Sequence, residues 1–230
     1  MVDYSSANVN CVSDDAGCNA SPVADYIIQG TLGIVAPIGN ETYSIGDPIP
    51  IKWTKTGSIG NVTLDYSTDN GGTWVTPAID GNVAAGNDSP TENTYNGWAA
   101  PAKVSEFFKV RIRTNTAPAG AELETISPAA FYVRPTLASF STPVDATRWY
   151  ASDTNRTITW NGVTGVKNDA SYPQVIVEYS VDGSLYTGNT ILDNYQFTAT
   201  PQNATWAALP DVKSKNVKVK VTFKEYANRN

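Results

Sequence analysis

The sequence predicts an all-β chain folded as two tandem β-sandwich domains, and three observations support this prediction. The 230 residues contain two copies of one pattern. Each copy divides into short segments in which apolar and polar residues alternate, as they do in strands with one face on a core. The composition, with 12 Tyr, 17 Gly, 14 Pro and one Met, favours strands and turns over helices.

The internal repeat sets the number of domains. The first copy reads IPIKWTKTG…NVTLDYSTDNGGTW…GWAAPAKV…FKVRIRT, and the second reads RTITWNGVTG…QVIVEYSVDGSLY…TWAALPDVKSKNVKVKVTF. Matching landmarks are separated by between 107 residues, from Trp53 to Trp160, and 113 residues, from Tyr66 to Tyr179. This period predicts two homologous domains of roughly 105 residues. We place them at 31–135 and 136–230, after an N-terminal arm at 1–30.

Within each copy the expected strands are short and amphipathic. In FKVRIR, residues 108–113, the apolar side chains of Phe108, Val110 and Ile112 alternate with cations, and VKVKVTF at 217–223 repeats the pattern. A Trp on an early strand, about seven strands per copy and turns rich in Gly and Pro together indicate an immunoglobulin-like sandwich.

A wider motif supports the same fold. A Pro, a later Gly-Asp, then Ile-x-Trp at 51–53 and Val-x-Leu-x-Tyr-Ser at 62–67 resemble the immunoglobulin-like repeats of Ser/Thr-rich GPI-anchored fungal wall proteins. The pattern is also similar to repeats of large bacterial surface proteins. The resemblance covers most of both copies, and it implies a cell-surface module that has no catalytic activity of its own.

The phase of the repeat leaves one strand over at the front. The segment FYVRPTLASFSTP, residues 131–143, supplies the last strand of the first domain (Phe131–Arg134) and the first strand of the second (Leu137–Ser141). YIIQGTLGIVAP, residues 26–37, aligns with it, so that Tyr26 matches Phe131 and Ile28 matches Val133. Residues 26–29 therefore look like a final strand whose own domain is absent. After the strand that ends near Lys224, only EYANRN follows, so we expect the second domain to lack a last strand of its own.

Three interpretations of this mismatch stay open. The chain is a piece of a longer repeat array, or residues 26–29 form an extra edge strand on the first domain, or Tyr26, Ile27 and Ile28 of one copy complete the second domain of the next. The third interpretation predicts head-to-tail assembly into a filament, surface layer or stalk. Charge agrees with it, because the front is acidic and the rear basic. The residues concerned are Asp3, Asp14, Asp15, Asp25, Glu41 and Asp47 at the front, and Lys213, Lys215, Lys218, Lys220, Lys224 and Arg229 at the rear.

The stretch YSTDNGGTW, residues 66–74, resembles the Asp box of sialidases, Ser-x-Asp-x-Gly-x-Thr-Trp. That box implies a structural β-hairpin turn, in which Asp69 accepts hydrogen bonds from the turn backbone and Gly71 or Gly72 takes a positive φ. Ser67 and Trp74 complete the motif, and the second copy keeps Ser180, Asp182 and Tyr186 with one residue fewer before the aromatic ring. Two boxes cannot supply the six blades that a sialidase needs, so we expect a turn and no enzyme.

Composition excludes several other site classes. With no His, the chain builds neither a Ser-His-Asp system nor a His-ligated metal site, and two Cys cannot make a four-thiolate site. We expect Cys11 and Cys18 to form a disulfide in an extracellular setting. No stretch of about 20 apolar residues predicts a membrane span. Candidate N-glycosylation sequons begin at Asn19, Asn40, Asn61, Asn155 and Asn203, and also at Asn87, which Pro90 follows.

The remaining candidate sites are weaker. We expect no cofactor, although oxygen atoms of Asp14, Asp15, Asp69, Asp80 or Asp88 are candidate ligands of a structural calcium ion. Trp149 and Tyr150, which have no counterpart in the first copy, are candidate contacts for a cell-wall or surface glycan. The acidic balance argues against nucleic acid. The sequence thus predicts an extracellular structural subunit that binds copies of itself, or alternatively a carbohydrate-binding or adhesive module of a larger surface protein.

Overall fold

The computed structural model describes residues 29–75, 77–115 and 122–224, and this part of the chain contains fifteen strands and no helix. The predicted all-β fold is therefore confirmed. Nine strands precede Pro135: β1 (Thr31–Ala36), β2 (Thr42–Ser44), β3 (Ile51–Thr56), β4 (Asn61–Ser67), β5 (Asp80–Ala84), β6 (Asn93–Tyr95), β7 (Ser105–Thr114), β8 (Glu124–Ile126) and β9 (Phe131–Arg134). Six follow it: β10 (Thr136–Thr142), β11 (Thr154–Val163), β12 (Gln174–Ser180), β13 (Thr190–Gln196), β14 (Gln202–Ala208) and β15 (Lys218–Phe223).

The first nine strands form two sheets of one sandwich. One sheet has the order β1-β3-β6, and the other has the order β2-β9-β7-β4-β5. Strands β8 and β9 follow each other along the same edge of β7, and β2 runs parallel to β9. With β3, β4 and β7 in the places of strands B, C and F, this is an immunoglobulin-like sandwich.

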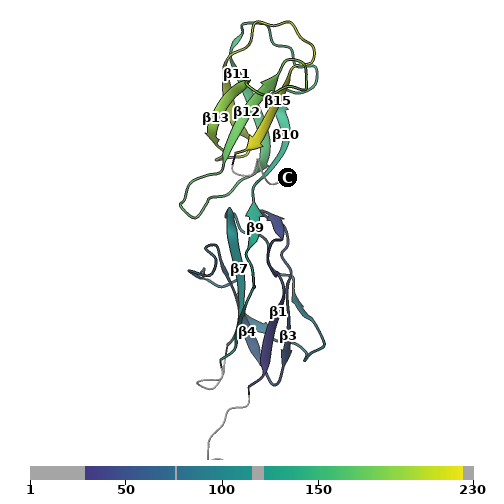
Figure 1. Cartoon of the computed structure of the whole chain (residues 1–230), viewed down its shortest axis with the longest axis vertical. Coiled ribbons are helices and arrows are strands. Elements are labelled where there is room, and N and C mark those ends of the chain that lie inside the picture. Colours follow the sequence, from purple (N-terminus) through teal and green to yellow (C-terminus); the bar gives the residue numbers. More distant parts are fainter. Residues whose placement is uncertain (1–28, 76, 116–121, 225–230) are drawn as a thin grey trace, which may run out of the picture.

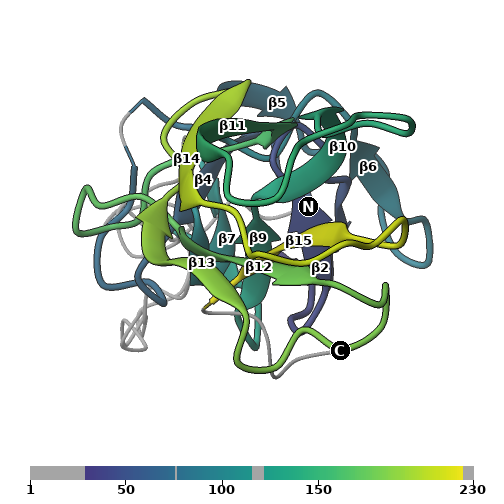
Figure 2. The same cartoon turned by 90° about the horizontal axis from the view of Figure 1, so that it is seen from above.

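The last six strands form a second sandwich with the orders β10-β11-β14 and β13-β12-β15. Figure 2 shows these strands from above, as two layers on either side of the long axis. The two sheets correspond to β1-β3-β6 and β5-β4-β7 of the first sandwich. Within residues 136–224, no strand takes the places of β2, β8 and β9.

Each sandwich has its own core because alternate residues of its strands point between the sheets. Trp53 on β3 and Trp160 on β11 occupy matching places, and each is only 1% exposed. Around them pack the apolar residues of facing strands, such as Leu64 in the first core and Val177 in the second. Burying these side chains is the main favourable term for each sandwich.

The sandwiches lie end to end (Figure 1), and two connections join them. The first is covalent, because only Pro135 separates β9 from β10. The second is a loop, residues 164–173, that reaches back from the second sandwich. Its Val166 accepts a hydrogen bond from the N–H of Val104 (2.9 Å) and donates its own N–H to the carbonyl of Ala102 (3.3 Å). Asn168 Nδ2 adds a hydrogen bond to the carbonyl of Thr68 (2.5 Å).

Candidate functional site

Strand β15 occupies the same place in the second sandwich as β7 does in the first. In the first sandwich Tyr66 of β4 lies opposite Val110 of β7, and in the second Tyr179 of β12 lies opposite Val219 of β15. This register allows residues of the two strands to be compared one by one.

A second pair of contacts fixes the same alignment. The hydroxyl of Ser105 donates to the carbonyl of Thr68 (2.7 Å), and the hydroxyl of Ser214 donates to the carbonyl of Val181 (2.5 Å). Both alignments give an offset of 109 residues, from 105 to 214 and from 110 to 219. The core-facing residues therefore match as Phe108 with Val217, Val110 with Val219, and Ile112 with Val221.

The matched side chains differ in exposure. The three core-facing residues of β7 are all 0% exposed. The counterpart of Phe108 is Val217, the residue just before β15, and it is 42% exposed, whereas Val219 and Val221 of β15 are half-buried. The chain from β8 to β9 accounts for the difference, because it lies along the whole edge of β7, and β9 contributes two side chains that are also 0% exposed, Phe131 and Val133. No described strand covers β15 in this way.

The backbone of β15 is also open along this edge. Tyr179 donates its N–H to the carbonyl of Asn189 (2.9 Å), on the side away from β15. Tyr179 and Val219 are therefore a non-hydrogen-bonded pair, and the N–H and C=O of Val219 face the outer edge. In the first sandwich the corresponding groups of Val110 bond to Ser127, whose N–H donates to the carbonyl (2.9 Å) and whose Oγ accepts from the N–H (2.8 Å).

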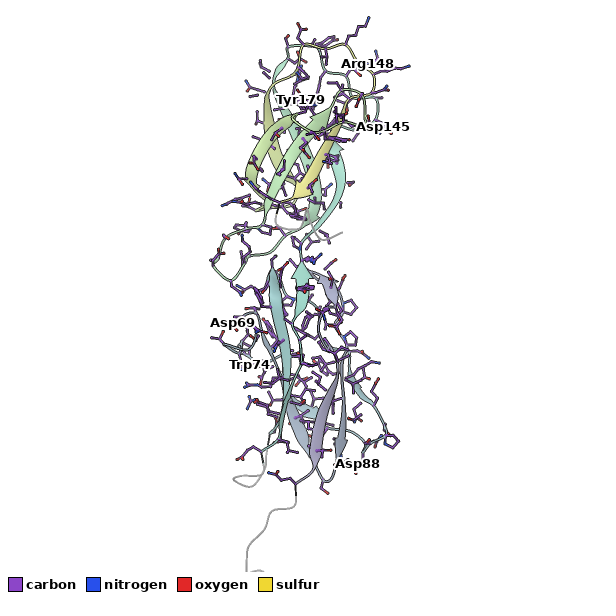
Figure 3. All side chains as sticks on the ribbon, viewed as in Figure 1. Asp69, Trp74, Asp88, Asp145, Arg148 and Tyr179 are labelled. Carbon is purple, nitrogen blue, oxygen red and sulfur yellow. The ribbon has the colours of Figure 1, made fainter. Side chains whose placement is uncertain are left out.

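A hollow of about 610 Å³ lies along the open edge. Its walls are the start of β15 with the residues before it, the end of β10, and the loop that follows β10. Figure 3 labels Asp145 and Arg148 on that loop, toward the end of the second sandwich that is far from the first. We call this region, bounded by residues 143–150 and 214–221, the open groove. The residues lining its hollow are Phe140, Pro143, Val144, Asp145, Ala146, Thr147, Lys215, Val217, Lys218 and Val219.

The aromatic surroundings of Phe131 recur at the open groove without a ring in the place of Phe131. In the first sandwich this ring lies 5.5 Å from Phe108, 5.6 Å from Tyr43 and 6.4 Å from Trp98, measured between centroids. In the second sandwich Trp206 takes the place of Trp98 and packs edge-on against Trp149, at 6.2 Å.

Trp149 has a counterpart that the sequence did not reveal. The N–H of Ser44 donates to Asp47 Oδ2 (2.7 Å), and the N–H of Tyr150 donates to Asp153 Oδ2 (2.8 Å). These equal turns align Trp149 with Tyr43, so the expectation that Trp149 has no counterpart was wrong, whereas Tyr150 aligns with Ser44 and has no aromatic counterpart. Of the two predicted glycan contacts, Trp149 is half-buried against the core, while Tyr150 is 76% exposed.

Both predicted Asp-box segments form tight turns. Asp69 Oδ1 accepts hydrogen bonds from the Ser67 hydroxyl (2.6 Å) and the Thr73 N–H (2.8 Å). These bonds, with Ser67 contributing most, lower the pKa of Asp69 to about 2. Ser67 Oγ also accepts from the N–H of Gly71, whose φ is 91°.

The second turn repeats this arrangement. Asp182 Oδ1 accepts from the N–H groups of Leu185 (2.9 Å) and Ser184 (2.8 Å) and from the Ser180 hydroxyl (2.7 Å). The pKa of Asp182 is held well below its usual range, chiefly by the N–H of Leu185. These contacts are those of turn-stabilising carboxylates, since each aspartate is occupied by its own turn.

The aromatic residue of each turn meets a cation on the outer face of the sheet. The guanidinium of Arg111 lies 4.2 Å from the ring centre of Trp74, and Lys220 Nζ lies 4.6 Å from that of Tyr186. Trp74, labelled in Figure 3, projects with Asp69 on the side of the first sandwich and is half-buried. The motif alone did not indicate this cationic partner.

The other candidate residues fall into two groups. Cys11, Cys18, Asp14, Asp15, Asn19 and the segment Tyr26, Ile27 and Ile28 lie outside the described residues. The remaining sequon asparagines have exposed side chains: Asn40, Asn61, Asn87, Asn155 and Asn203. Asp80 Oδ1 accepts the N–H of Asn82 (3.0 Å), and Asp88 pairs with Lys55 (2.6 Å).

Across 29–75, 77–115 and 122–224, no three acidic or sulfur-bearing side chains gather where they could hold a metal ion. None of the described residues forms a helix long and apolar enough to cross a membrane.

Comparisons with known proteins add little to this description. No family model and no curated protein matches the chain. Among solved structures, it is similar to the fibronectin(III)-like modules of CbhA from Clostridium thermocellum, with 18% identity and a TM-score of 0.27 over 84% of this chain and 93% of that one. A chimeric titin Z1Z2-Z1Z2 tandem carrying a GRGDS peptide from fibronectin has 14% identity and a TM-score of 0.24, over 82% of this chain and 90% of that one. The immunoglobulin-like assignment therefore rests on the strand order of the two sandwiches.

Proposed function

We propose that this chain is a non-catalytic structural subunit of the cell exterior that assembles head to tail. In this assembly residues 26–29 of one copy add a strand beside β15 of the next copy, in the place that β9 takes beside β7. The single observation that carries the proposal is the contrast between Val217, 42% exposed, and its match Phe108, 0% exposed. Val217 is exposed, and Val219 and Val221 of β15 are only partly buried against their own core. An added strand would complete their cover.

The sequence identifies residues 26–29 as the strand that fits. Tyr26-Ile27-Ile28-Gln29 aligns with Phe131-Tyr132-Val133-Arg134, which is β9. In β9 Phe131 lies opposite Phe108 and Val133 lies opposite Ser105. By the same register Tyr26 would lie opposite Val217, and Ile28 would lie opposite Ser214.

The donor strand would come from another copy because it cannot reach within one chain. Residues 26–29 join β1 through Gly30 alone, and four extended residues span at most about 14 Å. Figure 1 shows that β1 begins at the end of the first sandwich opposite to the second sandwich. A contact that one copy makes with a different surface of the next propagates along a line.

Two energetic terms favour the exchange. Burying Tyr26 and Ile28 in the open groove would contribute about 1.5–3 kcal/mol for each side chain. Backbone hydrogen bonds between the added strand and the residues around Val217 would add about 0.5–1.5 kcal/mol each. Association also has an entropic cost, so the assembly we expect is reversible and depends on protein concentration.

A disulfide trap tests this register. In a chain with Cys11→Ser and Cys18→Ser, the pair Tyr26→Cys and Val217→Cys should oxidise to a ladder of covalent oligomers on a non-reducing gel. The matched control is Ile27→Cys with Val217→Cys, because successive side chains of a strand point to opposite faces. Monomers only in the first pair, or equal cross-linking in both, would contradict the proposal.

Deletion supplies an independent test with its own control. Removing residues 1–30 should abolish large assemblies in sedimentation velocity, whereas removing residues 1–20 should leave them. If the shorter chain lacking 1–30 assembles as the full chain does, the donor strand is not the connection between copies.

A carbohydrate-binding or adhesive module is the alternative function, and the exposed ring of Tyr150 favours it. Exposed aromatic rings stack on sugar faces, and here the ring stands on a loop at the far end of the second sandwich. A glycan array comparing the chain with its Tyr150→Ala variant distinguishes the two functions. Binding that is lost in the variant while assembly is unchanged would support the alternative.

A further inference from the structure

We infer that the open groove is built for a longer partner than a four-residue strand, namely residues 21–29 of a second copy, beginning with Ser21-Pro22. This inference rests on the proposed function and specifies the partner segment of the same site. It follows from what occupies the corresponding space in the first sandwich, where the chain between β8 and β9 fills the region beside β7.

In the first sandwich, Ser127, Ala129 and Ala130 fill the space beside β7 and bond to the residues around it. Ser127 is 1% exposed, and it satisfies both backbone groups of Val110 by using its own N–H and its Oγ. The N–H of Ala129 donates to the carbonyl of Ile38 (3.0 Å), and the N–H of Asn40 donates to the carbonyl of Ala130 (2.8 Å). The segment 127–130 is therefore held from two sides.

In the second sandwich, counterparts of the residues that bond to segment 127–130 line the hollow of the open groove. Val219 corresponds to Val110, and Ala146 to Asn40. Ala146 has a φ of 68°, against 66° for Asn40, although an alanine rarely adopts this left-handed conformation. The loop at residues 143–150 thus has the same backbone conformation that, in the first sandwich, directs the Asn40 N–H toward Ala130. In the second sandwich this loop lies beside the hollow.

The N-terminal arm carries a second copy of the segment that fills this region. Ser127-Pro128-Ala129-Ala130 precedes Phe131, and Ser21-Pro22-Val23-Ala24-Asp25 precedes Tyr26. The arm has one additional residue between the proline and the aromatic ring.

The wall of the open groove offers a reason for the additional residue. A Cβ on Gly39 would lie 2.3 Å from the Cβ of Ala129, so the first sandwich needs glycine there. The corresponding residue of the second sandwich is Asp145, which has a Cβ. An incoming segment therefore cannot follow the path of Ala129, and one more residue lets it pass farther from the loop.

Charge agrees with the same occupant. The hollow is lined by Lys215 and Lys218 against the single acid Asp145, which leaves it net positive. Residues 21–29 carry one charged side chain, Asp25, of the opposite sign. The attraction between exposed charges is modest and falls with added salt, so it would adjust the affinity of a contact that depends mainly on shape and backbone pairing.

Peptide binding tests the inference on a chain that lacks residues 1–30. The described core residues, which begin at Leu32, are all kept in this chain. The probes are synthetic peptides of residues 20–30 and 25–30, measured by calorimetry. We expect the longer peptide to bind at least tenfold more tightly. A Ser21→Ala version should lose about 3- to 10-fold in affinity, which is the range for one net hydrogen bond. Hydrogen exchange should slow at the Val219 amide with the long peptide and not with the short one.

The outcomes separate this inference from the proposed function. If both peptides bind with equal affinity and neither protects Val219, the partner is the short strand and the inference is wrong while the proposed function stands. If neither peptide binds, the donor-strand function itself is wrong. If the longer peptide binds more tightly but Ser21→Ala has no effect, the segment occupies the hollow in a different register, and the role given to Ser21 is wrong.

Discussion

The two sandwiches agree on their outer faces and differ along one edge. Each has a turn held by an aspartate whose aromatic residue meets a cation, and each has an acid on the central strand beneath that cation, Asp65 or Glu178. Among the strands that the structure describes, only those of the first sandwich, β8 and β9, cover the F-position strand. The difference teaches that the exposed apolar side chain just before β15, Val217, is not required by the core of its own sandwich as described. The strand that we propose a neighbouring copy adds would account for it.

The largest expected contrast is between the matched residues Phe108 and Val217. Phe108→Ala should lower the free energy of unfolding of the first sandwich by about 3–5 kcal/mol, because it empties a fully buried site. Val217→Ala in a chain lacking residues 1–30 should change the stability of the second by no more than about 0.5 kcal/mol. Hydrogen exchange of β4 and β12 amides follows each sandwich separately. A large effect at Val217 in this chain would show that the open groove is already filled from within.

A smaller contrast is expected on the outer faces. Asp65 is 5% exposed and bonds to both Arg111 (2.9 Å) and Arg113 (2.8 Å). Arg111→Gln should therefore cost about 2 kcal/mol, less than the loss of a sole partner, because Arg113 still pairs with the buried carboxylate. Lys220 is 43% exposed and pairs with Glu178, so Lys220→Gln should cost less than about 1 kcal/mol. Urea denaturation of the two variants measures both values, and equal costs would contradict the difference in burial.

The smallest effect should be the acid dependence of the turns, which we expect to be alike in both sandwiches. The folded-state pKa of Asp69 is about 2, below its ordinary value of 3.8. Its ionised form therefore contributes stability above pH 3.8, and the contribution is lost as the pH falls through about 2. Asp69→Asn should lower the melting temperature at pH 7 by a few degrees. The melting temperature of this variant should also decrease less than that of the parent chain between pH 4 and pH 2.

The control for that experiment is the other turn. Asp182 has its pKa lowered in the same direction by the same kind of hydrogen bonds, so Asp182→Asn should act with the same sign on the second sandwich. A variant that gains stability at pH 7 would show that the turn carboxylate is not a net contributor.

Much of the fold could be predicted because the repeat and the strand alternation are local signals. The alternation gave the limits of β9 as observed, Phe131–Arg134, and it placed the first strand of the second sandwich within one residue at each end of β10. About seven strands were expected in each copy, and the first has nine. Strands β2, β6 and β8 have three residues each, which is too short for an alternation to show in the sequence.

The candidate site could be predicted only in part, because it depends on register between distant segments. The sequence indicated a vacancy after β15 from the phase of the repeat. It did not indicate that the loop after β10 forms the opposite wall, since residues 143–150 have no strand pattern of their own. The matching of Trp149 to Tyr43 likewise became visible only from equal hydrogen-bonded turns.

The short joint between the sandwiches has a mechanical consequence. Within one chain the joint has two attachments, Pro135 and the backbone contact of Val166 with the loop before β7. Between assembled copies Gly30 would replace Pro135, but the loop between β3 and β4 spans only residues 57–60, against 164–173 in the second sandwich. It is too short to make the second attachment. A fibre of such subunits would be stiff between the two sandwiches of one chain and flexible between neighbouring chains. A pulling force on the fibre would load every exchanged strand in shear.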